Sequence, residues 1–160
     1  MRGVTLLVGL LGIVLDAAAA PVPALPAVEP CPYNVGELAV TLGMSFKAGV
    51  GKSTPIPGGV QTTCAYAPSD GYMTLLLKQT VLAPADHQQR AAAFAATLTS
   101  PLAPIANDPD GASWQLDPYS PNNVALHYQR GTHRIELRAQ DGMKKASTMQ
   151  PKLLRLRHLP

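Results

Sequence analysis

The chain has 160 residues, of which 46% are hydrophobic and 14% charged, and its formal net charge is +3. With 16 prolines and 13 glycines, this composition predicts one small globular domain with some irregular segments. Beyond the first 20 residues no apolar run is long enough to cross a bilayer, and the basic C-terminal segment lacks aromatic residues for stacking on bases. We therefore expect neither an integral membrane protein nor a nucleic-acid-binding protein.

Residues 1–20 have the three-part layout of a secretory signal peptide. Arg2 begins it, Gly3 to Leu15 is a nearly uninterrupted apolar run, and small residues end it at Ala18–Ala20. An apolar core of this length is too short to span the roughly 30 Å of a bilayer as a stable helix. The pattern predicts cleavage and a secreted or periplasmic localisation.

A proline-rich linker and a disulfide are predicted next. Alternate prolines in residues 21–30 favour an extended linker, so the folded domain is expected over residues 31–140. Cys31 and Cys64 are the chain's two cysteines, and in an oxidising compartment they are expected to form a disulfide. On the chain-entropy model this bond raises the free energy of unfolding by roughly 3 to 4 kcal/mol.

A short amphipathic helix is predicted over residues 34–43. Asn34 is a favourable N-cap, Glu37 stands three residues later in a capping-box position, and Gly43 provides the stop. One apolar stripe is expected on this helix: Val35, Leu38 and Leu42.

Residues 48–54 read AGVGKST and require a test as a phosphate-binding loop. That loop needs a glycine five residues before its Gly-Lys pair, where this chain has Phe46. It also opens a helix, which Pro55 and Pro57 do not sustain. We interpret the stretch as a flexible loop without nucleotide-binding function.

The first hairpin is predicted from residues 60–67 and 72–81, which are rich in β-formers and flank a turn sequence. With Ala67 opposite Tyr72, Cys64 lies on the apolar side of the hairpin, within reach of Cys31.

A second helix is expected over residues 84–99, because Pro84 suits a first helical position and an alanine-rich run follows. Residues 100–111 are then a proline-punctuated loop, and residues 112–116 a possible strand.

A second hairpin is predicted over residues 124–129 and 132–138, with Tyr128 opposite His133. One face is then apolar, and the other carries the candidate binding residues His127, Gln129, Arg134 and Arg138. This register puts the two hairpin histidines on opposite faces, with His127 solvated and His133 half-buried, so no metal site and no cofactor are expected.

Residues 141–160 form a basic segment with a net charge of +4, which leaves −1 for the rest. Its cations are Lys144, Lys145, Lys152, Arg155 and Arg157. With interleaved leucines it is suited to an anionic membrane surface or an acidic partner. The alternative is a terminal helix over about residues 142–150 followed by a frayed or edge-pairing segment.

Catalytic patterns are weak in this chain. Ser113, Asp117 and His127 are close in sequence but lack the Gly-x-Ser-x-Gly pattern of a nucleophile elbow. The function expected is therefore a non-catalytic binding module for an unknown partner, such as another envelope or extracellular protein. There are two alternatives. One is an extracellular hydrolase with an unrecognised site, and the other is an envelope-associated protein that uses its basic segment.

The element order helix, hairpin, helix, strands, helix predicts an α+β fold. We expect an antiparallel sheet of about four to five strands with two or three helices packed on one face.

One family resemblance rests on the layout Cys31-Pro32-Tyr33, then a helix ending at Leu42-Gly43, then Cys64-Ala65-Tyr66. It covers roughly Cys31 to Leu77 and is similar to small exported bacterial proteins and lipoproteins of unknown function. The resemblance implies a helix-and-antiparallel-sheet fold with one disulfide, and no particular activity. The chain departs from the lipoproteins because it lacks a lipid-attachment cysteine.

Overall fold

The computed structural model describes residues 27–83, 101–140, 142–157 and 159. The elements, in chain order, are α1 (Val35–Leu42), β1 (Val50–Ile56), β2 (Gly59–Tyr66), β3 (Thr74–Leu82), β4 (Leu102–Pro104), β5 (Ser113–Leu116), β6 (Val124–Arg130), β7 (His133–Gln140) and α3 (Ala146–Arg155). The predicted signal peptide, most of the predicted linker and the predicted helix over residues 84–99 lie outside the described residues.

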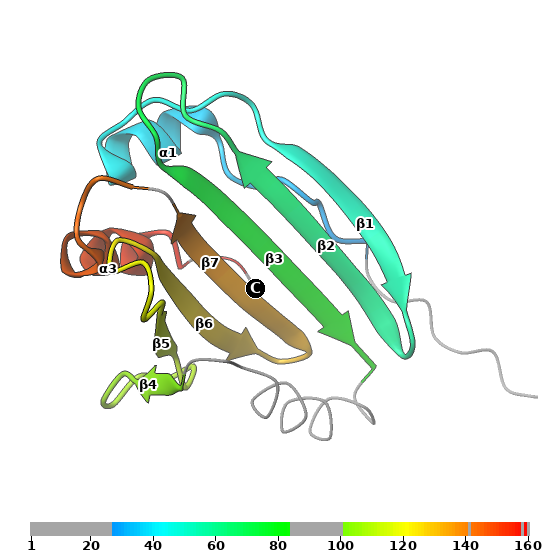
Figure 1. The fold of residues 1–160 in the computed structure, drawn as a ribbon. Helices are drawn as coiled ribbons and strands as arrows, with labels where there is room; N and C mark the ends of the chain where they lie inside the picture. Colours follow the sequence, from blue (N-terminus) through cyan, green and yellow to red (C-terminus); the bar gives the residue numbers. More distant parts are fainter. Residues whose placement is uncertain (1–26, 84–100, 141, 158, 160) are drawn as a thin grey trace, which may run out of the picture.

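All described strands belong to one antiparallel sheet, in the order β1-β2-β3-β7-β6-β5-β4 (Figure 1). Strands β1 to β3 follow one another as a meander, and β4 to β7 form a second one. The pairing of β3 with β7 joins the two meanders. The last strand of each meander thus lies at the centre of the sheet, and the first strand of each lies at an edge.

The predicted α+β fold class is wrong, because the described chain is mostly β, with seven strands and two helices. The two strands that were not predicted, β1 and β4, are the two edges of the sheet. All residues of β1 except the last are exposed, so its sequence has no apolar alternation to reveal it. Most of AGVGKST is therefore an edge strand and not the flexible loop that was predicted.

Both predicted hairpin registers are wrong by two residues. Cys64 lies opposite Leu77, and Tyr128 lies opposite Ile135. In the second hairpin the turn moves along by one residue, so that Gly131, with a φ of 55°, takes the first turn position. Because side chains alternate with a period of two, a two-residue shift leaves every side chain on its predicted face.

The hydrophobic core lies between the two helices and one face of the sheet, which we call the covered face. The strands contribute buried residues at alternate positions: Cys64, Tyr66, Leu75, Leu77, Leu126, Tyr128, Ile135 and Leu137. From the helices, Leu38 and Leu42 of α1 and Met149 and Leu153 of α3 pack against them. Val35, predicted for the same stripe of α1, is instead 38% exposed.

Helix α1 begins and ends as its sequence predicts. The side chain of Asn34 accepts a hydrogen bond from the N–H of Gly36 at 2.7 Å, and Gly43 ends the helix with a φ of 72°. The ammonium group of Lys152 donates to the carbonyl of Leu42 at 2.5 Å, which places a cation at the negative end of the helix.

The predicted disulfide between Cys31 and Cys64 is confirmed, with 5.3 Å between the two Cα atoms. Its sulfurs lie directly against the backbone of the segment that leads into β1. A Cβ on Gly49 would come within 2.6 Å of the Cys64 Sγ, and one on Gly51 within 2.7 Å of the Cys31 Sγ. The two glycines of AGVG are therefore needed because the disulfide occupies the space of their side chains.

We predict that Gly51→Ala lowers the free energy of unfolding by about 1 to 3 kcal/mol, because its methyl group overlaps the Cys31 sulfur and the Pro30 side chain. Urea unfolding of the oxidised protein measures this change. The matched control is Gly142→Ala, since a Cβ there has its nearest neighbour at 3.5 Å. If the two substitutions lowered the free energy of unfolding equally, position 51 would not need glycine to leave room for the disulfide.

Candidate functional site: the polar face of the sheet

The face of the sheet opposite the covered face, which we call the polar face, carries the predicted binding residues. The polar side chains that it carries from β3, β5, β6 and β7 include Lys78, Ser113, Gln115, His127, Gln129, Arg134, Glu136 and Arg138. The register pairs Gln129 with Arg134 and Glu136 with both Lys78 and His127. The four residues predicted to form a binding face therefore share one surface, and their role in binding stays a prediction.

His127 differs from its predicted solvated state, because it is only 6% exposed. Its Nε2 atom lies 3.0 Å from the side-chain oxygen of Gln115 on β5. Burial lowers the pKa of His127 below the ordinary value of 6.5, against the opposite effect of Glu136. The imidazole is thus neutral at pH 7 and is part of the framework of this face.

Gln115 also orients Arg138. The Nη2 group of Arg138 donates to the Gln115 side-chain oxygen at 3.2 Å, while its Nε group donates to Glu136 at 2.9 Å. Lys78 and Arg134 lie on the same face, so Glu136 is the one carboxylate among three cations on strands β3 and β7. This part of the polar face carries an excess of positive charge at neutral pH.

A cleft of about 400 Å³ opens beside Arg138. It is lined by Gln115, Leu116, Asp117, Pro118, Tyr119, Asn123, Val124, Ala125 and Arg138. The loop between β5 and β6 forms one wall, where the side chain of Asp117 accepts a hydrogen bond from the N–H of Tyr119 at 2.9 Å. Tyr119 is 93% exposed, so an aromatic ring stands at the rim of a cleft that has a guanidinium group in its lining.

The sequence prediction missed Gln115 and this cleft. The alternation of Ser113, Trp114 and Gln115 indicates that Gln115 shares a face with Ser113, but the pairing of β5 with β6 is needed to place it beside His127. Tyr119 lies in a turn sequence, and turn sequences give no indication of a cleft.

The residues considered for a hydrolase are only partly brought together. Ser113 is the register partner of His127, whereas Asp117 lies in the loop after β5. Asp117 lines the cleft, and neither Ser113 nor His127 does. In the described part of the chain, no three His, Cys, Asp or Glu side chains are grouped so that they could hold a metal ion.

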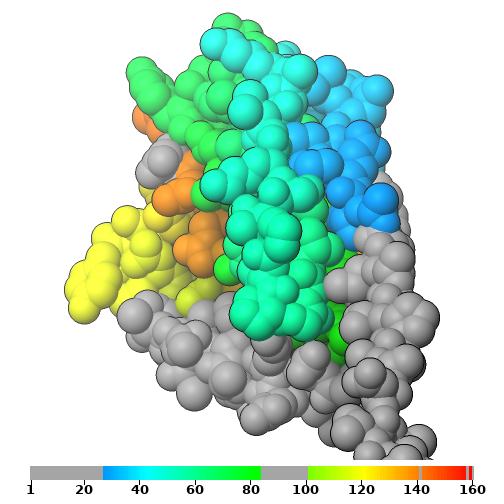
Figure 2. All heavy atoms as spheres, turned by 90° about the vertical axis from the view of Figure 1, so that its right-hand side faces the viewer, coloured from blue at the N-terminus to red at the C-terminus, as the bar shows by residue number. Residues whose placement is uncertain are grey.

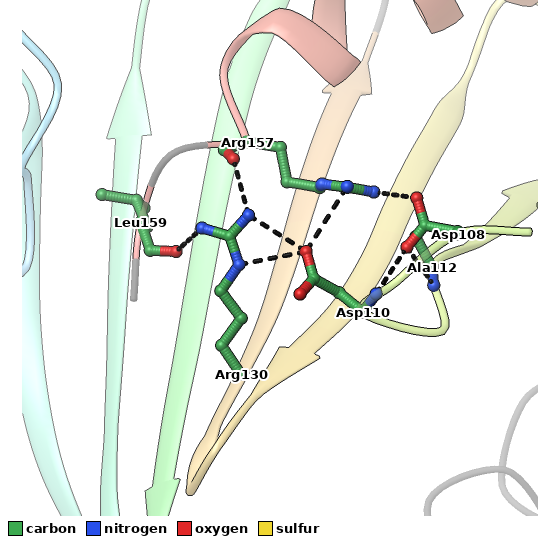
Figure 3. A network of polar contacts seen from close by, with 6 residues as sticks. All are labelled: Asp108, Asp110, Ala112, Arg130, Arg157 and Leu159. Atoms are coloured by element: carbon green, nitrogen blue, oxygen red, sulfur yellow. Dashed lines mark hydrogen bonds and ion pairs between the residues drawn. The ribbon is translucent and has the colours of Figure 1, made fainter.

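Part of the predicted basic segment is used inside the fold (Figure 3). Arg157 donates to Asp108 and lies 3.4 Å from Asp110, which also accepts from Arg130 at 3.0 Å. Arg130 donates further to the carbonyl groups of Arg157 and Leu159, at 3.2 and 2.9 Å. This network, which we call the arginine clamp, ties the C-terminal residues to β6 and to the loop between β4 and β5.

The remaining cations of the segment divide between structural and exposed positions. Lys152 contacts the end of α1, while Lys144, Lys145 and Arg155 are exposed. Of its leucines, three are buried in the core: Leu153, Leu156 and Leu159. The segment is packed rather than frayed, and these leucines are not available to a membrane surface. Among the described residues, no helix has the length and apolarity needed to cross a membrane.

Comparison with known proteins gives no match, since no family model fits the chain and no curated protein or solved structure is similar to it. The resemblance to small exported proteins therefore stays a prediction.

Because of the arginine clamp, we expect the free energy of unfolding to fall at acidic pH. Burial raises the pKa of Asp108, but the hydrogen bonds from Arg157 and from the N–H groups of Ala112 and Asp110 outweigh this and hold the pKa below its ordinary value. A lowered pKa in the folded state gives stability that is present above the unfolded pKa of about 4 and is lost as the pH falls through the folded value.

We predict that Asp108→Asn lowers the free energy of unfolding at pH 7 and reduces its decline at acidic pH. Urea unfolding at pH 7, 5 and 3 measures both effects, with the exposed Asp70→Asn as the control. An unchanged pH dependence in Asp108→Asn would show that the clamp carboxylate does not stabilise the fold in this way.

Proposed function

We propose that this chain is a secreted or periplasmic, non-catalytic binding module that binds an anionic ligand in the cleft beside Arg138. Export is supported by the signal-peptide pattern of residues 1–20 and by the disulfide, which forms in oxidising compartments.

The observation that supports anion binding is the preorganised guanidinium group of Arg138. Glu136 and Gln115 hold it from two sides, and Lys78 and Arg134 add positive charge on the same face. Arginine recognises carboxylates and phosphates through its planar N–H donors. Glu136 and Gln115 engage the Nε and Nη2 groups of Arg138, so the proposed donor to a ligand is its Nη1 group. A cleft of about 400 Å³ is of the size that takes a small ligand or the side chain of a larger partner.

The residues at the rim of the cleft indicate what kind of group the ligand carries beside its anionic group. Exposed Tyr119, together with Leu116 and Pro118, offers apolar and aromatic surface next to the charged group. A ligand with a flat apolar part and one anionic group matches both features. Binding is favoured over hydrolysis because Ser113 and His127 lie outside the cleft lining and the His127 Nε2 atom is engaged with Gln115.

We predict that benzoate, used as a minimal probe, binds the cleft with a dissociation constant in the millimolar range, as expected for so few atoms. Titration of ¹⁵N-labelled protein, followed by ¹H–¹⁵N correlation spectra, should give saturable shifts at the amides of Gln115, Tyr119 and Arg138. Benzamide has the same shape without the charge and should shift them far less.

Arg138→Gln should weaken benzoate binding by about tenfold or more, in line with a charge-assisted hydrogen bond. Lys144→Gln, which removes an exposed cation elsewhere, is the matched control. Equal shifts with benzoate and benzamide, or unchanged benzoate binding in a folded Arg138→Gln protein, would refute an anion site at this residue.

A further inference from the structure

Strand β1 is a long edge strand at the opposite side of the sheet from the cleft. It has seven residues and ends the strand order. Figure 2 looks onto this edge and shows the atoms of β1, in turquoise, along the middle of that side of the molecule. An edge strand presents backbone donors and acceptors that a further strand can pair with.

The pairing pattern of β2 defines which backbone groups of β1 point outward. The carbonyl of Gly58 accepts from the N–H of Ala83, so alternate residues of β2 starting at Gly58 bond to β3 and the intervening ones bond to β1. By this alternation the backbone groups of Gly51, Ser53 and Pro55 point away from the sheet. Proline lacks an N–H, so the outward donors are those of Gly51 and Ser53.

A groove of about 300 Å³ lies on the polar face, over β2 and β3, and the side chain of Val50 lines its end nearest the sheet edge. Val50, Ala65 and Leu76 form its apolar part, and Lys78 and Glu136 line it further in. Val50 is 78% exposed, although it is a β-branched apolar residue at the start of the strand. An aliphatic side chain from an added strand, opposite Val50, would pack against this exposed side chain at the outer end of the groove.

The positive charges beside the groove favour the binding of a segment that carries acidic residues. Lys52 stands two residues after Val50 on the same face, in one cross-strand row with Thr63 and Lys78. In the described part of the chain, neither lysine forms an ion pair, since Glu136 is paired with Arg138. A carboxylate opposite Lys52 would meet a surplus of positive charge.

We propose that β1 is a docking strand for an extended acidic segment of a partner protein, which adds to the sheet antiparallel to β1. Strand addition takes its affinity from main-chain hydrogen bonds and its specificity from alternate side chains. Antiparallel order places a glutamate opposite Lys52 and, two residues later, an aliphatic residue opposite Val50. The recognised pattern is thus Glu-x-Leu, and it does not depend on a ligand at Arg138.

The test uses the disulfide-bonded protein and a fluorescein-labelled peptide, Thr-Glu-Thr-Leu-Thr, followed by fluorescence anisotropy. The peptide should bind, and in ¹H–¹⁵N spectra it should shift the amides of Gly51 and Ser53. Lys52→Glu should weaken binding by about tenfold, because it replaces an exposed attraction with a repulsion. The same variant should then prefer the peptide with lysine in place of glutamate, which also shows that it is folded.

N-methylation of the peptide separates strand addition from charge attraction alone. Methylation at the central threonine, whose N–H faces Gly51 in this register, should abolish binding, whereas methylation at leucine, whose N–H points away, should not. Equal effects of the two methyl groups would overturn the proposal. A dimer in sedimentation experiments that the peptide does not dissociate would overturn it as well, because a second copy of the chain would then occupy the edge.

Discussion

The disulfide between Cys31 and Cys64 determines how the N-terminal part of the described chain meets the sheet. Cys31 immediately precedes the turn into α1, and Cys64 lies in the second strand from the edge. Their sulfurs rest against Gly49 and Gly51, which are narrow enough to let the bond pass beneath β1. The position of the helix and the presence of glycine just before β1 and at its second residue are therefore linked to one covalent bond.

Two hydrogen bonds of Tyr33 link the segment before α1 to β2 and to the residues after α3. The N–H of Tyr33 donates to the hydroxyl of Tyr66 at 2.9 Å, and the Tyr33 hydroxyl donates to the carbonyl of Leu156 at 2.7 Å. Burial is the main cause that raises the pKa of Tyr33, so it stays a hydrogen-bond donor at any physiological pH. One residue next to the disulfide, Tyr33, thus connects the N-terminal segment to β2 through its main-chain N–H and to the C-terminal residues through its hydroxyl group. The polar face of the sheet takes no part in these contacts.

The sequence predicts those features that depend on local pattern. Asn34 and Gly43 delimit α1, and the alternation in β6 and β7 assigns Leu126 and Arg138 to opposite faces even though the register is shifted by two residues. Features that depend on long-range packing are not predictable in this way. Strand β1 has no apolar alternation because nearly all of it is exposed, and Gln115 acquires its place beside His127 only when β5 pairs with β6.

The disulfide clamps α1 and β1 to the rest of the sheet, and hydrogen exchange measures this restraint directly. In the Cys31→Ser/Cys64→Ser protein we expect the amides of α1 and β1 to exchange on the order of a hundredfold faster than in the oxidised protein, the equivalent of roughly 3 kcal/mol. Amides of β3 and β7, at the centre of the sheet, should keep more of their protection. Unchanged exchange in α1 and β1 would show that the disulfide does not hold these two elements in place.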